Sequence, residues 1–96
     1  MIADFQHWFL TEQEHFLKEF KCHFHDSQHD SAYLDLDMDA KEIMGRICLW
    51  GDGQCNVEMW DFESGAMLDW QYQEFGSWEE ACLFMTSWVS RWKTTS

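Results

Sequence analysis

Hydrophobic residues return along the chain with two different periods, and the change from one to the other separates helices from strands. Over residues 2–25 they recur at spacings of three, four or seven, which places them on one face of an α-helix. We therefore expect one long helix here, although Thr11 and Glu14 have the form of a capping box at which the helix could begin or be interrupted. The polar residues 25–31 predict a loop.

The middle of the chain alternates apolar and polar residues, the pattern of strands that are buried on one face. In the first such segment Leu34, Leu36 and Met38 alternate with aspartates, so its outer face is acidic. Turns rich in glycine, aspartate and serine separate the segments, and the Gly-Asp-Gly run at 51–53 is a strong hairpin signal. The four expected strands are residues 32–38, 43–50, 54–62 and 66–75.

A second helix is expected over residues 78–93, because Ser77 is a good N-cap and Glu80 completes a capping box. Short connections make the strands antiparallel neighbours, and both helices are expected to cover the same face of the sheet. The predicted fold is an α+β single domain over residues 1–96. It has a four-stranded antiparallel meander sheet flanked by an N-terminal and a C-terminal helix (α-β-β-β-β-α).

This packing leaves one face of the sheet open, and one alternating set of residues combines aromatic rings with carboxylates. Rings of this kind most often anchor protein contacts, so the set suggests an interface. The sequence does not fix the register, and we favour a core position for at least half of these residues. The set is Trp50, Glu58, Trp60, Trp70, Tyr72 and Glu74.

Composition adds a strong negative charge, with 18 acidic residues against six basic ones and a net charge of −12. Nucleic acid and anionic membranes need clustered lysine and arginine, so we expect neither to be a partner. A basic protein surface would be attracted, although the charge could serve solubility alone. The first ten residues lack a basic signal-peptide region, so we expect a cytoplasmic protein whose four cysteines are free, buried thiols.

Two groups of residues could suggest a metal site or catalysis. Cys22, His23, His25 and His29 are close in sequence, but their spacing on a helix does not bring zinc ligands together, and a Cys–His nucleophile would lack a third, orienting group. The aspartates at 35, 37 and 39 have the spacing of a calcium loop, but the glycine that such a loop needs is absent after them. We therefore expect no catalytic residue, no cofactor and no metal.

Five runs of sequence in the sheet region carry a family pattern. They read LDLD at 34–37, MGRICLW at 44–50, GQCNVEM at 53–59, DFESG at 61–65 and WQYQEF at 70–75. Together these runs, over about residues 34–75, resemble the TriTu family of bacterial immunity proteins, whereas the flanking helices resemble that family only in kind. Within the runs, Gly45, Gly53 and Gly65 suit turns or bulges.

The resemblance implies an immunity protein that neutralises a cognate Rhs-type toxin delivered by a type VI secretion system. Such a toxin is an ADP-ribosyltransferase that modifies elongation factor Tu, and the immunity protein would bind the toxin domain and block its active-site cleft. The resemblance carries no catalytic residues, so the protein is not expected to be an enzyme. An acidic inhibitor of a nuclease toxin, or an intracellular adaptor or chaperone for secretion, remains an alternative.

The residues expected to contact the toxin are acidic positions on the first strand, at the turns and on the sheet, together with one tryptophan. They are Asp35, Asp37, Asp52, Glu58, Trp60, Asp61, Glu63 and Asp69.

Overall fold

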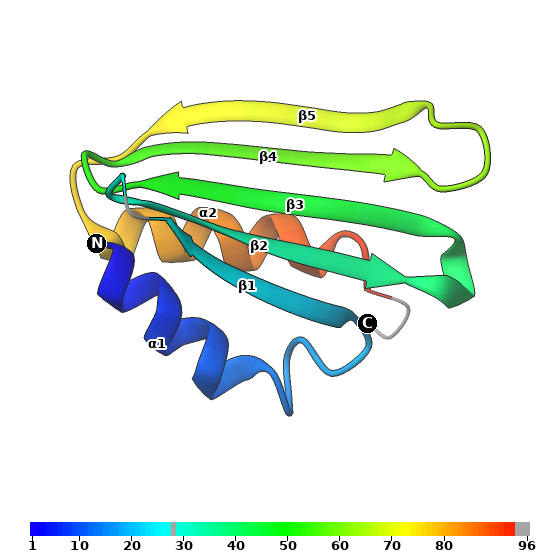
Figure 1. The fold of residues 1–96 in the computed structure, drawn as a ribbon, viewed down its shortest axis with the longest axis horizontal. Coiled ribbons are helices and arrows are strands. Elements are labelled where there is room, and N and C mark those ends of the chain that lie inside the picture. The colour runs from blue at the N-terminus through cyan, green and yellow to red at the C-terminus, as the bar shows by residue number, and fades with distance from the viewer. Residues whose placement is uncertain (28, 94–96) are drawn as a thin grey trace.

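The computed structural model describes residues 1–27 and 29–93 and shows two helices packed on one face of a five-stranded sheet (Figure 1). The strands follow one another in space as they do in sequence, each antiparallel to its neighbours. The α+β class is confirmed, with one strand more than predicted. The elements are α1 (Ile2–Glu12), β1 (Lys21–Ser27), β2 (Ser31–Met38), the 3-10 helix η1 (Asp39–Lys41), β3 (Ile43–Trp50), β4 (Gln54–Asp61), β5 (Met67–Glu74) and α2 (Trp78–Ser90).

The additional strand, β1, occupies residues that the periodicity assigned to the first helix, so that prediction was wrong. The helix α1 ends at Glu12, a series of turns follows, and β1 begins at Lys21. Phe16, Phe20 and Phe24 are four residues apart, and positions four apart face the same side in both a helix and a strand. The stripe therefore could not distinguish the two structures.

The expected loop over residues 25–31 was also wrong, because β1 continues to Ser27 and β2 begins at Ser31. The two strands pair over their whole length, from Lys21 opposite Asp37 to Ser27 opposite Ser31. Gln28 lies outside the described residues. Only a short connection therefore remains where the sequence predicted a longer loop.

The remaining elements lie within a few residues of their predicted positions. The Ser77 hydroxyl accepts a hydrogen bond from the Glu80 N–H (3.3 Å), which confirms the predicted N-cap of α2. Gly53 has a φ of +97°, and a Cβ there would lie 2.0 Å from the Phe75 carbonyl oxygen, so the β3–β4 hairpin requires glycine. Gly45 is neither in a turn nor at a bulge; it lies within β3 against the Met59 side chain.

The hydrophobic core lies between the helices and one face of the sheet. Phe5 and Phe9 of α1 contact the ring of Phe24 on β1, with centroids 5.2 and 5.5 Å apart, while α2 packs near the other end of the strand order. Among the described residues, no polar or charged residue is buried. The buried hydrophobic residues of the strands are Ala32, Leu34, Leu36, Met38, Ile43, Ile47, Leu49, Cys55, Val57 and Met59.

Candidate protein-binding face

The strand register places one alternating set of residues on the face of the sheet that points away from the helices, and we call this the open face. Its side chains form rows that run across the sheet from β1 to β5. The first row is Lys21, Asp37, Met44 and Trp60, and a shift in register follows on β5, where Met67 is the partner of Trp60. The second row is His23, Asp35, Arg46, Glu58 and Trp70; the third is His25, Tyr33, Cys48, Asn56 and Tyr72.

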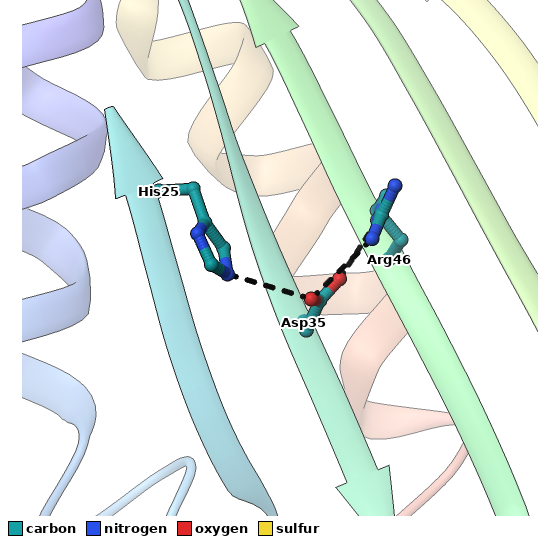
Figure 2. A network of polar contacts seen from close by, with 3 residues as sticks. All are labelled: His25, Asp35 and Arg46. Carbon is teal, nitrogen blue, oxygen red and sulfur yellow. Dashed lines mark hydrogen bonds and ion pairs between the residues drawn. The ribbon is translucent and has the colours of Figure 1, made fainter. Parts of the chain in front are cut away.

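The part of the open face on β1 and β2 is polar, and its Asp35 carboxylate lies among side chains that pair with it. Figure 2 shows Asp35 between His25 and Arg46, which come from the strands on either side. The Arg46 Nε donates to Asp35 Oδ1 at 2.7 Å, and His25 Nε2 lies 3.6 Å from Asp35 Oδ2. The hydrogen bond with Asp35 raises the pKa of Arg46. Tyr33 completes the group, because its ring stacks on His25 (4.5 Å) and lies under the Arg46 guanidinium (4.4 Å).

The part of the open face on β3, β4 and β5 carries large rings. Trp70 and Tyr72 of β5 are 55% and 44% exposed, and Trp50 and Trp60 are half-buried. The expectation that at least half of the aromatic and acidic set fills the core was wrong. Its physical reason is the register, because these residues alternate with positions that face the helices, and on β3 and β4 those positions form the core.

Strand β5 reverses the usual distribution of polar and apolar residues. Its positions on the helix side are Asp69, Gln71 and Gln73, whereas its rings point to the open face. A strand selected only to complete the core would place its apolar residues under the helices. The rings of β5 therefore contribute little to the core and are available to a partner.

Glu58 is an acidic residue without an ion pair at the centre of this face. It lies directly opposite Arg46 in the strand register, but the guanidinium pairs with Asp35 instead. No ion pair with Glu58 lies within 4.0 Å in residues 1–27 and 29–93. The ring-bearing half of the face thus presents a free carboxylate between Trp60 and Trp70, and together they suit a basic partner surface.

The structure brings half of the predicted contact residues together. Asp35, Asp37, Glu58 and Trp60 all lie on the open face, in its first two rows. Glu63 lies nearby, in the exposed turn between β4 and β5. These five positions are compatible with one docking surface.

The other three predicted residues have different surroundings. Asp52 lies in the β3–β4 hairpin, at the opposite end of the sheet, where its carboxylate accepts hydrogen bonds from Gln54 that lower its pKa. Asp61 accepts hydrogen bonds from the Ser64 N–H (3.1 Å) and hydroxyl (2.6 Å), so it holds the β4–β5 turn and its pKa is lowered.

Asp69 faces the helices and not the open face. Its Oδ2 accepts hydrogen bonds from Trp88 Nε1 (2.8 Å) and Gln71 Nε2 (3.0 Å), and the Arg91 guanidinium lies 3.6 Å away. The hydrogen bond from Trp88 is the main cause that lowers the Asp69 pKa. Asp69 therefore links β5 to α2.

Sequence reasoning missed several residues of this region. Tyr33, His25 and Arg46 were not proposed as contact residues, although alternation over residues 21–25 was a signal for a strand with outward histidines. Phe62, which is 69% exposed beside the β4–β5 turn, was assigned to the end of a strand. Nothing in the hydrophobic pattern distinguishes an exposed phenylalanine from a buried one at such a position.

Cys22 does not face the same side of β1 as the histidines that follow it in the sequence. Cys22 faces the helices whereas His23 and His25 face outward, because neighbouring residues of a strand point to opposite faces. All four cysteines are free, and burial raises the pKa of Cys22 to about 11 and that of Cys55 to about 12. Within the described ranges, no group of three or more His, Cys, Asp or Glu could hold a metal ion.

The fold and the open face define an acidic α+β domain with a ring-bearing surface, a class of protein suited to binding another protein. The chain belongs to the family described as Immunity protein TriTu, whose sequence profile matches residues 3–91. The resemblance inferred from residues 34–75 is thereby confirmed, and it extends into both helices. No curated protein matches the chain. In the part of the chain that the structure covers, no helix is long and apolar enough to cross a membrane.

Proposed function

We propose that this protein binds and neutralises a cognate secreted antibacterial ADP-ribosyltransferase toxin, of the Rhs type delivered by type VI secretion, by covering its active-site cleft. Membership of the immunity family supports a toxin as the partner. The observation that carries the proposal is the reversed strand β5, which exposes Trp70 and Tyr72 on the open face while its polar residues face the helices. The protein would act in the cytoplasm of the producing cell and its siblings.

Charge supports a toxin whose cleft is basic. A transferase that uses NAD binds a diphosphate, and phosphate recognition relies on arginine, lysine and backbone N–H groups. The net charge of −12 attracts such a surface from a distance, and Glu58 meets it at the centre of the open face. We expect the association rate to fall as salt is added; a flat dependence would contradict this electrostatic contribution.

The proposed role is inhibition by binding, without catalysis by this chain. Burial, partial for Cys22 and complete for Cys55, raises the pKa of both thiols, so they stay protonated near neutral pH and are poor nucleophiles. His23 and His25 lie on the opposite face of β1 from Cys22. These placements give no support to a Cys–His enzyme.

The test is a titration of the purified toxin domain with this protein, following transfer of ADP-ribose from NAD to elongation factor Tu. We expect inhibition to be complete at one immunity protein per toxin. We also expect NAD to compete with the immunity protein for binding to the toxin. A toxin that keeps full transferase activity while bound would contradict blockage of the cleft. A partner that degrades nucleic acid would instead establish the nuclease-inhibitor alternative.

A co-expression assay in cells distinguishes toxin inhibition from the adaptor or chaperone alternative. Co-expression of the toxin domain alone with this protein, without any secretion machinery, should restore growth if the protein is an inhibitor. The control variant Leu83→Ala should restore growth as well as the wild type does, because Leu83 is 71% exposed on α2, away from the open face. Failure to protect a cell that makes a folded, active toxin domain would reject inhibition.

A further inference from the structure

A pocket of about 530 Å³ opens at the end of the sheet where β2 leads into β3 and β4 leads into β5. Both connections lie at the same end of the molecule (Figure 1), and the Phe62 N–H donates to the Glu42 carbonyl oxygen at 2.7 Å. This hydrogen bond joins the two connections that form the rim. The pocket is lined by Asp37, Met38, Asp39, Glu42, Ile43, Phe62 and Glu63.

The lining combines apolar surface with carboxylates. Met38 and Ile43 belong to the hydrophobic core and contribute apolar surface, while the Phe62 ring is 69% exposed beside them. Four of the seven lining residues are acidic and none is basic. An aromatic ring together with carboxylates around an apolar hollow is the chemistry that receives a cation on an aliphatic stem.

The nearby cations of this chain are already engaged. Lys41 points away and donates to the carbonyl oxygens of Trp92 (3.0 Å) and Lys93 (3.2 Å), beyond the end of α2. Lys21 pairs with Asp39 at 2.9 Å. For Asp37, Glu42 and Glu63 the described part of the chain offers no ion pair within 4.0 Å. Burial, followed by the neighbouring charge of Asp35, raises the pKa of Asp37.

The pocket is continuous with the open face. Asp37 is both a lining residue and a member of the first cross-strand row, which continues through Met44 to Trp60. A protein seated on the rings of the open face would therefore also reach the pocket.

We propose that this pocket receives one basic side chain of the toxin, an interaction that rests on the proposed function and adds a specific anchor to it. Arginine fits better than lysine, because a planar guanidinium can stack on Phe62 while donating to two carboxylates, for example Glu42 and Glu63. The anchor would fix the orientation of the toxin on the open face.

The test compares two variants with the same change in charge. Glu42→Gln/Glu63→Gln alters the pocket, and Glu14→Gln/Glu79→Gln alters two exposed glutamates outside it. Both remove two negative charges, so long-range attraction changes equally. On immobilised toxin domain, we expect the pocket variant to dissociate at least ~10-fold faster, and the control to change mainly the association rate by a small factor. Thermal unfolding of both variants checks that each is folded.

A scan of the toxin's arginines and lysines to alanine then identifies the inserted side chain. One substitution should weaken binding to the wild-type protein strongly and to the pocket variant little, which is the coupling that a double-mutant cycle measures. The proposed role of the pocket would be overturned if the pocket and control variants lost the same amount of toxin affinity, or if no basic residue of the toxin were coupled to the pocket. Either result would leave the proposed function intact. Absence of binding by the wild-type protein would overturn both.

Discussion

The two faces of the sheet are made from the same strands but follow different rules. On the face under the helices, β2, β3 and β4 present apolar side chains that are almost fully buried, whereas the edge strand β5 is polar. On the open face, polar and charged side chains on β1 and β2 give way to tryptophans, a tyrosine and a free glutamate on β4 and β5. Burial explains the apolar strands of the first face. Solvation alone does not explain the rings on the second, which is the face that we propose binds the toxin.

Truncation of Leu36 tests the covered face and should have the largest effect. Leu36 is 0% exposed and lies on the helix side of β2. Leu36→Ala removes buried apolar atoms and leaves a cavity, which should lower the free energy of unfolding by about 2–5 kcal/mol. Urea denaturation measures this, and toxin affinity of the folded fraction should stay unchanged. A loss below about 1 kcal/mol would contradict a tightly packed core under the helices.

Truncation of Trp70 tests the open face, and it should affect toxin binding more than stability. Trp70→Ala should weaken toxin binding by about 2 kcal/mol, roughly 30-fold, because an exposed tryptophan beside Glu58 is a typical interface anchor. Its effect on unfolding should be about 1 kcal/mol or less, since it loses only cross-strand contacts on an edge strand. Calorimetry and urea denaturation on the same sample give both numbers. Unchanged affinity, together with the same result for Tyr72→Ala, would show that the toxin docks elsewhere.

Asp69 is the exception that links the polar edge strand to the covered face. The Trp88 side chain is almost fully buried, so Asp69→Ala would leave its indole N–H without its acceptor and cost about 1–3 kcal/mol of stability. Binding should not change, because Asp69 faces the helices. A large loss of affinity in a stably folded variant would reassign Asp69 to the docking surface.

The pH dependence of Asp69 has a defined sign. Its pKa is lowered in the folded protein, first by the hydrogen bond from Trp88. The stabilisation is therefore fully present above the unfolded-state pKa and is lost as pH falls through the folded-state pKa. Asp69→Asn, whose amide oxygen can still accept from Trp88, should lose less stability than the wild type over this acidic interval. An unchanged acid profile would contradict this contribution.

The sequence predicted the elements wherever two independent signals agreed. Strands β2 to β5 combine alternation with glycine- and aspartate-rich turns, and α2 combines periodicity with the Ser77 cap, so their predicted positions hold. At β1 the only signal considered was phenylalanines four residues apart, which suits a helix and a strand equally. The alternation over residues 21–25 was the local signal that could have resolved this ambiguity in favour of a strand.

The candidate site was harder to predict than the fold for a different reason. Alternation divides a strand into two sets, but it does not say which set the helices cover. Nor does an acidic side chain show whether it is free: Asp35 pairs with Arg46, Asp69 holds Trp88, and Glu58 remains unpaired. Which carboxylates are available follows only from the register, which joins residues far apart in the sequence.

Substitution of Asp37 should have the smallest effect of these variants. It sharpens the comparison between the two faces because it should change stability and toxin binding in opposite directions. Its pKa is raised, first by burial and then by the charge of Asp35, so the ionised carboxylate is disfavoured in the folded protein. A raised carboxyl pKa means that stability falls as pH rises from the unfolded-state to the folded-state pKa, and the penalty persists above it. Asp37→Asn should therefore stabilise the protein at neutral pH, by up to about 0.5 kcal/mol.

This gain should shrink as pH falls through the Asp37 pKa, because the wild-type carboxyl is then neutral as well. Toxin affinity at neutral pH should instead decrease, since the pocket loses a charge. Asp26→Asn is the matched control: Asp26 is exposed on β1 and does not line the pocket, so the same change in net charge should leave stability and dissociation rate nearly unchanged. If Asp37→Asn is less stable than the wild type at neutral pH, or binds the toxin as tightly as the control does, the Asp37 carboxylate does not trade stability for toxin binding.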